Sequence, residues 1–175
     1  HRNVIELGAN ASLTKILAVE RAEADLTLGE VTEFLIMRDG RELSGQEIML
    51  ILGAPEVLAR NTVRTFVGLH AFDRNQPFII AEVSTYDLAF DAMLTWEDRM
   101  AETLNDFFAP VKRTPVPPPL IFAYRVFRNL DLRESGTTWP IVYTFPERNV
   151  LIITTNESTL KEAITRLAIS KTRSI

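Results

Sequence analysis

The stretch Thr65–Leu94, TFVGLHAFDRNQPFIIAEVSTYDLAFDAML, decides the fold that the sequence predicts. Residues 65–72 and 77–83 are rich in aromatic and aliphatic residues, a composition that favours strands. The polar segment DRNQ, residues 73–76, separates them and has the length of a hairpin connection. The two segments are therefore predicted to form an antiparallel β-hairpin.

A helix is predicted directly after this hairpin, from about Ser84 to Phe108. Ser84 and Thr85 are favourable N-cap residues, and Asp87 places an acid in the first turn. A face this apolar is expected to pack against a sheet. Its apolar residues form two adjacent stripes, which are Ala89, Met93, Trp96, Met100 and Phe107, and Phe90, Leu94, Ala101, Leu104 and Phe108.

The C-terminal part of the chain repeats this order of elements. Residues 121–133 and 139–145 alternate like strands, and a third strand, VLIITT at 150–155, follows the turn PERN. A closing helix is predicted over 157–169, with Thr155 or Asn156 as its N-cap. Because both parts contain a hairpin followed by a helix, the sequence favours an internal duplication of a ββα unit.

The N-terminal region is predicted to contribute a helix over 12–25 and a strand over 31–37. Ser44 is the expected N-cap of a short helix that ends at Gly53, and residues 56–60 form a second short helical turn. All these elements precede the hairpin and belong to the same half of the chain.

A proline-rich segment, residues 110–120, separates two halves, 1–109 and 121–175. Proline cannot continue a helix or enter the interior of a sheet, so the segment is predicted to be an extended connector. The alternative is a proline-rich ligand for aromatic grooves. The halves are expected to pack as one α+β unit with a mostly antiparallel sheet of about six strands and helices on one face.

The composition excludes several classes of protein. Hydrophobic residues make up 46% and charged residues 24% of the chain, which is typical of a folded domain rather than a disordered one. A net charge of -4 argues against a nucleic-acid partner. The absence of cysteine removes disulfides, thiolate nucleophiles and the common zinc sites. We therefore expect no cofactor and no metal.

Catalytic side chains are scarce. His70 lies in a predicted strand with Asp73 nearby, and an enzyme would use them as a base and its orienting acid. A histidine that merely sits on a strand face is the commoner case. The chain has no nucleophile elbow, phosphate-binding loop, dinucleotide fingerprint or metalloprotease motif. We assign no catalytic, cofactor-binding or metal-binding residue.

Two further groups of residues deserve a chemical interpretation. The long helix carries a group of carboxylates, which a glycosidase or a calcium site would use but which here are predicted to form a solvated face. Aromatic side chains are candidates for a sugar-stacking surface, although their positions favour packing. The carboxylates are Asp87, Asp91, Glu97, Asp98 and Glu102, and the aromatic residues are Tyr86, Trp96, Tyr124, Trp139 and Tyr143.

Three segments carry a resemblance to a known family. They are GLHAFDRNQPFIIAEVSTYDLAFDAMLTWEDRM, VLIITTNESTLKEAITRL and RDGRELSGQEIMLILG, and the similarity covers roughly residues 30 to 168. In this pattern the chain resembles uncharacterised, predicted membrane-anchored proteins of small-genome bacteria of the candidate phyla. The resemblance implies an extracytoplasmic domain and an N-terminal membrane anchor outside this sequence. It implies no active site.

The resulting hypothesis is a non-enzymatic extracytoplasmic interaction or assembly domain of a membrane-anchored envelope protein. Its partner is expected to be another envelope protein, in an assembly such as a secretion or pilus-like apparatus. No apolar run reaches the roughly 20 residues of a transmembrane helix, so the anchor is expected to precede His1. The alternatives are a hydrolase of an envelope polymer that uses His70 and carboxylates, and a small-ligand binding domain at the junction of the halves.

The predicted cap of the last helix leads to a test. Replacing Asn156 by alanine removes a side-chain acceptor for the first-turn amides, so Asn156→Ala is expected to lower the free energy of unfolding by about 1 kcal/mol. Chemical denaturation measures this change. Partner binding should stay intact, and a loss of binding at unchanged stability would contradict a purely capping role.

Overall fold

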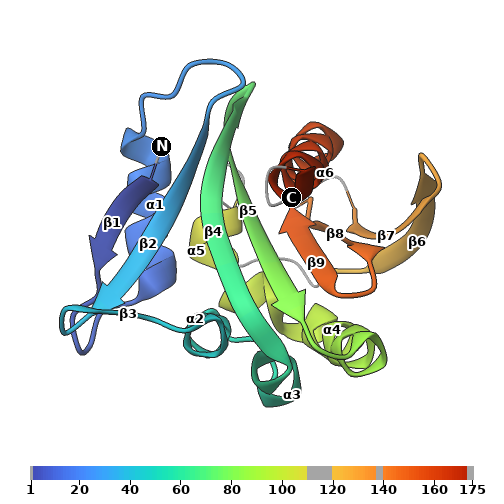
Figure 1. Cartoon of the computed structure of the whole chain (residues 1–175), viewed down its shortest axis with the longest axis horizontal. Coiled ribbons are helices and arrows are strands. Elements are labelled where there is room, and N and C mark those ends of the chain that lie inside the picture. Colours follow the sequence, from blue (N-terminus) through green and yellow to red (C-terminus); the bar gives the residue numbers. More distant parts are fainter. Residues whose placement is uncertain (1, 110–119, 137–139, 173–175) are drawn as a thin grey trace.

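The computed structural model describes residues 2–109, 120–136 and 140–172. This part of the chain folds around one curved sheet of nine strands in the order β1-β2-β4-β5-β9-β8-β7-β6, and β3 pairs with β2 beside this path (Figure 1). The strands are β1 Arg2–Glu6, β2 Val31–Arg38, β3 Arg41–Glu42, β4 Thr62–Phe72, β5 Arg74–Val83, β6 Phe122–Phe127, β7 Leu130–Ser135, β8 Val142–Glu147 and β9 Val150–Thr154.

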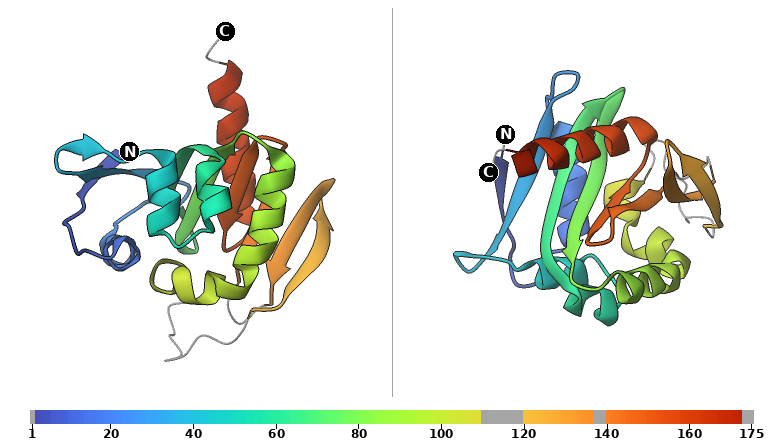
Figure 2. Two further views of the ribbon diagram at one scale, coloured as in Figure 1. Left: turned by 90° about the horizontal axis from the view of Figure 1, so that it is seen from below. Right: turned by 45° about the vertical axis from the view of Figure 1, so that its right-hand side comes forward.

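The described residues also form six helices, which lie on both faces of the sheet (Figure 2). Five of them, α1 to α5, pack on one face, and α6 packs on the other. The predicted α+β class with a mostly antiparallel sheet is confirmed, and among the described strands only β1 and β2 pair in parallel. The helices are α1 Leu13–Glu23, α2 Gly45–Ile51, α3 Glu56–Arg60, α4 Tyr86–Thr103, α5 Asn105–Phe108 and α6 Glu157–Thr172.

The hairpin β4–β5 forms as predicted, but its turn is tighter. The strands pair as far as Phe72 with Arg74, and Asp73 alone makes the reversal with a φ of 61°. The predicted four-residue connection was therefore too long, because Arg74, Asn75 and Gln76 already belong to β5. Asn75 has a structural role there, since its side-chain amide donates to two backbone carbonyls at the end of α1.

The two halves meet at the centre of the sheet. β5 pairs with β9 in antiparallel register, with Ile79 opposite Ile153 and Ala81 opposite Leu151. These four side chains are fully buried and face α1 to α5. The alternate residues of the same strands face α6, so β5 and β9 contribute to both hydrophobic layers.

The predicted duplication is not confirmed. Both hairpin-helix units are present, β4–β5–α4 and β8–β9–α6, and they adjoin through β5 and β9. Neighbouring antiparallel strands such as β5 and β9 are related by a two-fold axis perpendicular to the sheet. This rotation does not exchange the faces of the sheet, so it would place both helices on the same face. Because α4 and α6 lie on opposite faces, the units have opposite handedness, which a duplicated unit would not show.

Two expectations about single elements were wrong, and one strand was missed. Residues 121–133 form a hairpin, β6–β7, not one strand; Arg128 and Asn129 turn the chain with φ of 50° and 64°. The long helix is interrupted at Leu104, which separates α4 from α5. The edge strand β1 was not predicted. Of the predicted connector 110–120, only Leu120 lies inside the described residues.

Arg21 ties three of these elements together. Its guanidinium donates from Nε to the Asn75 carbonyl at 2.8 Å and from Nη1 to the Phe107 and Ala109 carbonyls at 2.9 Å. Burial, and secondarily the charge of Arg74, lowers the pKa of Arg21 to about 10, so the side chain stays charged at neutral pH. The charged group closes the C-terminal end of α5 against α1 and β5.

Removing this contact should weaken the fold. Arg21→Met leaves three partly buried carbonyls without their charged donor and is expected to lower the free energy of unfolding by about 3 kcal/mol. Urea denaturation measures the change. The matched control is Arg60→Met on the exposed side of α3, where the ion pair with Glu56 is solvated and should contribute less than about 1 kcal/mol. Equal losses in both variants would contradict the proposed role of Arg21.

Candidate functional site

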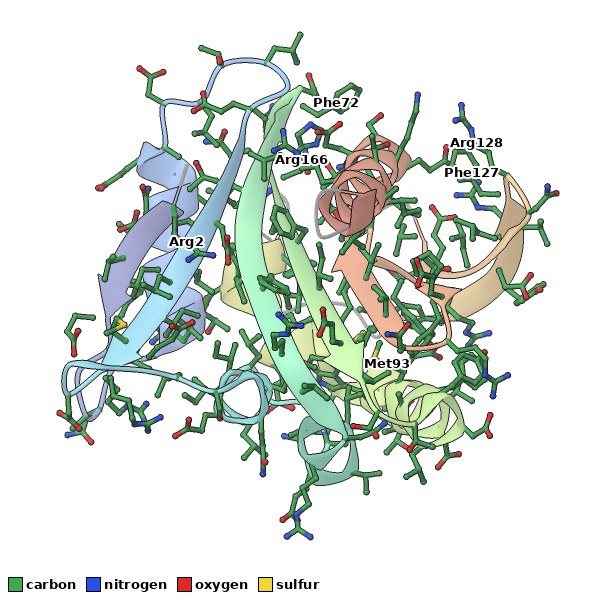
Figure 3. The ribbon with its side chains drawn as sticks, in the orientation of Figure 1. Arg2, Phe72, Met93, Phe127, Arg128 and Arg166 are labelled. Atoms are coloured by element: carbon green, nitrogen blue, oxygen red, sulfur yellow. The ribbon has the colours of Figure 1, made fainter. Side chains whose placement is uncertain are left out.

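The face of the sheet that carries α6 is only partly covered. α6 packs on β9 and β4, and the strands beyond β4 on this face have no helix among the described residues (Figures 1 and 3). A groove of about 410 Å³ runs between α6 and the strands β2 and β4. It is lined by Val31, Glu33, Phe66, His70, Phe78, Ile80, Thr159, Glu162, Ala163, Arg166 and Leu167.

The floor of the groove follows from strand alternation. Phe66, Gly68 and His70 share one face of β4, and Phe78 lies opposite Gly68 on β5. A Cβ at Gly68 would lie 2.5 Å from the Phe78 ring and 2.3 Å from the carbonyl oxygen of Thr32. Glycine is therefore required at this point, because it lets the Phe78 ring lie across the strand and form the floor.

His70 is the buried polar residue of this floor, with 5% of its surface exposed. Its Nδ1 lies 3.0 Å from the Thr159 hydroxyl on α6, which joins strand and helix. Burial lowers the pKa of His70, Arg166 lowers it further, and Glu162 acts in the opposite direction. The neutral imidazole is therefore favoured, and among the described residues its Nε2 has no hydrogen-bond partner.

Charged pairs border the groove on both sides. Arg166 donates to Glu162 on α6 at 2.7 Å, and Arg2 on β1 lies 3.1 Å from Glu33 on β2. Figure 3 shows Arg166 near the upper part of β4 and Arg2 beside β2. Since each pair is internally neutral, the groove combines an apolar floor with a balanced rim.

A second hollow continues the groove along the sheet. β2 pairs with β4 only from Val31 to Phe34 and then diverges, which leaves a hollow of about 370 Å³ beside α2. Glu33 and Phe66 line both the groove and this hollow, so the two depressions adjoin. Together they form an elongated depression over β2 and β4.

The N-termini of two helices shape its walls. Asn156 caps α6 through a 2.9 Å hydrogen bond from the Thr159 amide, so the predicted cap is confirmed. Ser44 and Glu47 cap α2 reciprocally, as a capping box. Gly45 lies against the backbone of Arg64, where a Cβ would come within 2.7 Å, so α2 packs closely on β4.

The candidate catalytic residues do not assemble. His70 bonds to a hydroxyl, and no hydrogen bond joins it to a carboxylate within the described ranges. Asp73 lies in the hairpin turn. The described part of the chain contains no group of His, Asp and Glu residues arranged to hold a metal.

The helix carboxylates separate into two kinds. Glu97 points inward, where it accepts from Arg133 at 2.7 and 2.8 Å and from the Tyr143 hydroxyl at 2.6 Å. The prediction that these carboxylates are solvent-exposed is therefore wrong for Glu97 and correct for the other four. Those four are the exposed residues Asp87, Asp91, Asp98 and Glu102.

Three of the predicted aromatic residues come together elsewhere. Tyr86, Tyr124 and Tyr143 line a smaller hollow of about 210 Å³ between α4 and strands β6 to β8. Trp96 is instead buried in the core, where its Nε1 donates to Thr103. Trp139 lies outside the described residues.

Comparison with protein-family models, with curated proteins and with solved structures finds no match for this chain. Within the described residues, no helix has the length and hydrophobicity to cross a membrane. The proposal for the function therefore rests on the geometry of the groove and on the sequence.

Sequence reasoning named only His70 among the residues of the groove. The apolar spacing in α6 and the alternation in β4 were visible, but they predicted burial rather than an open surface. The floor residues come from β2, β4 and β5 and the wall from α6, so the groove follows from strand order.

The environment of His70 makes stability depend on pH. The folded chain has a lowered His70 pKa, so below the ordinary value near 6.5 the unfolded chain binds more protons and stability is lost. His70→Gln lacks this titration. The stability advantage of the wild type over His70→Gln is expected to shrink as the pH falls from about 7.5 to about 5.5. Urea denaturation across this range measures it, and a constant difference would contradict the lowered pKa.

Proposed function

We propose that this chain is a non-enzymatic protein-interaction domain that binds an amphipathic helix of a partner protein in the groove beside α6. The observation that carries the proposal is the incomplete helical layer on this face. Apolar side chains of the open strands remain accessible next to a helix that covers only the neighbouring strands. They include Val4, Val31, Leu35 and Phe66, and Val4 is 65% exposed.

A helix suits this depression better than a compact ligand does. Packed helices lie about 8 to 10 Å apart, so a partner helix beside α6 would rest over β2 and β4. Its apolar residues at positions i, i+3 or i+4 and i+7 would enter the groove and the adjoining hollow in turn. A row of apolar side chains along one face of the partner helix would fill this elongated depression.

The ion pairs at the rim of the groove contribute to the choice of the partner helix more than to the strength of its binding. The pairs Glu162–Arg166 and Arg2–Glu33 each contain both signs of charge, so they favour a partner helix with alternating acids and bases along its flanks. The unpartnered Nε2 of His70 provides one hydrogen-bonding atom for a polar residue in the apolar stripe of the partner. Affinity would come chiefly from the apolar side chains at the centre.

The resemblance to predicted membrane-anchored proteins supports a proposal for the cellular location of this domain. We propose that it is held at the outer side of a bacterial membrane and that its partner belongs to an envelope assembly, such as a secretion or pilus-like apparatus. In such a place a groove for a helix would connect the anchored protein to a neighbouring component.

A helical peptide library displayed on phage or yeast tests the proposal. Binders selected on the wild-type domain are measured by fluorescence anisotropy against Phe66→Glu, which places a carboxylate in the apolar floor. Because a buried, unpaired charge is costly, the affinity should fall at least about tenfold. Val57→Glu, an exposed apolar residue on α3, is the matched control and should bind within about twofold of the wild type.

The location of binding is checked independently. Amide resonances of the labelled wild-type domain should shift on β2, β4 and α6 when a selected peptide is added. Selected helices that keep full affinity for the folded Phe66→Glu variant, or that shift resonances on other elements, would refute the groove as the binding site. Circular dichroism confirms that each variant is folded.

A further inference from the structure

The smaller hollow lies on the opposite face of the sheet, between α4 and the strands β6 to β8. It measures about 210 Å³, half the volume of the groove, and is lined by aromatic and polar side chains in similar proportion. Its lining residues are Tyr86, Phe90, Tyr124, Asn129, Leu130, Asp131, Leu132, Arg133, Tyr143, Thr144, Phe145 and Pro146.

Aromatic rings surround this hollow from three elements. Tyr86 and Phe90 on α4 stack with ring centroids 5.8 Å apart, and the Phe145 ring meets Tyr86 edge-on at 5.1 Å. Tyr124 stands on the edge strand β6, with 60% of its surface exposed. Tyr143 completes the lining from β8. A cation near several such rings is attracted by their negative faces.

The ionic groups leave one negative charge in the hollow. Arg133 forms a two-point ion pair with Glu97, so their charges cancel. Asp131 accepts a hydrogen bond from the Tyr124 hydroxyl, and no described cation forms an ion pair with it. The carboxylate of Asp131 is thus the charge without a counterion among the described residues that line the hollow.

Two polar groups of the hollow are fixed in place by hydrogen bonds. The Thr144 hydroxyl donates to the backbone carbonyl of Asp131 at 2.7 Å and holds the start of β7. Burial strongly raises the pKa of the Tyr143 hydroxyl, and its hydrogen bond to Glu97 raises it further, so this group stays a neutral donor. These two groups are therefore preorganised for a ligand, whereas Tyr124 and Asp131 are exposed.

One ring of this aromatic cluster already binds a cation, the side chain of Arg148. The Arg148 guanidinium lies 4.8 Å from the centre of the Tyr86 ring and 3.5 Å from Asp87. Arg148 does not line the hollow, and Asp87 balances its charge. The hollow combines rings with the Asp131 carboxylate, and its one described cation, Arg133, is already paired with Glu97.

From these contacts we infer that the hollow binds a small organic cation, namely a quaternary ammonium group of the choline type. Rings on several sides match the methyl groups, and Asp131 matches the positive charge. A free choline-like molecule and a phosphocholine lipid headgroup share this chemistry. The site goes beyond the proposed helix-binding function, because it lies on the other face and uses none of the groove residues.

Titration of the labelled domain with choline, followed by amide and tyrosine ring resonances, tests the inference. Saturable shifts are expected at Tyr86, Tyr124 and Asp131. The neutral isostere of choline, in which a quaternary carbon replaces the nitrogen, should bind at least about fivefold more weakly. Equal binding of choline and the isostere, or no saturable shift with choline, would overturn the inference.

Two variants and their controls complete the test. Asp131→Asn removes the charge and keeps the size of the side chain, and Tyr124→Leu removes the ring and its hydrogen bond to Asp131, so each should weaken choline binding about fivefold. Asp98→Asn on α4 and Val19→Ala on α1 are exposed controls outside the hollow and should change affinity less than about twofold. Unchanged affinity in both folded site variants would refute the site.

Titration with glucose tests whether the hollow is a sugar site, and titration with vesicles of phosphocholine lipids tests whether it binds a lipid headgroup. Saturable binding of glucose at the same resonances without choline binding would replace the cation site by a sugar site and overturn the inference. Binding of both free choline and vesicles supports the lipid headgroup as the source, and binding of choline alone supports a free ligand. Peptide binding in the groove is measured separately with Phe66→Glu, so the failure of either proposal is recognised on its own.

Discussion

The antiparallel pairing of β5 with β9 is the constraint on which the rest of the structure depends. It brings residues 78–82 and 150–154 side by side, although they lie about seventy residues apart in the chain. Both strands have apolar side chains on both faces, with Ile79 and Ile153 on one face and Ile80 and Ile152 on the other. A strand of this kind must be covered from both sides to exclude water.

The two faces meet this requirement differently. Five described helices cover one face, where Trp96, Met100 and Phe107 belong to the same buried cluster as Ile79 and Ile153. On the other face α6 covers the central strands but leaves β2 and part of β4 accessible. The groove is therefore a consequence of an unequal distribution of helices over one continuous sheet. Its floor remains narrow and apolar because Gly68 admits the Phe78 ring.

Elements that depend on short-range sequence patterns were predicted correctly. Regular alternation and a wide apolar stripe were enough for β4, β5 and α4, although Thr85 at the N-cap of α4 makes no side-chain capping hydrogen bond. The hairpin β6–β7 was missed because Arg128 and Asn129 lack the glycine that usually marks a turn with positive φ. β1 escaped because a parallel edge strand depends on a distant partner, here β2.

The candidate sites were less predictable than the elements, because each site combines residues from several of them. His70 was visible as a lone histidine, but its meeting with Thr159 requires α6 to lie across β4. Tyr86, Tyr124 and Tyr143 were recognised as aromatic residues. Their gathering around one hollow requires the β6–β7 hairpin, which periodicity had interpreted as a single strand.

The same hairpin connects the two faces physically. Tyr124 and Arg125 are neighbours on β6 and so point to opposite faces. Tyr124 lines the aromatic hollow, whereas Arg125 pairs with Glu134 on β7 and with Glu157 at the start of α6. The first turn of α6 also carries Thr159, which holds His70 in the groove floor. A ligand that contacts Tyr124 on one face therefore acts on the strand whose Arg125 pairs with the N-terminal turn of the groove helix on the other face.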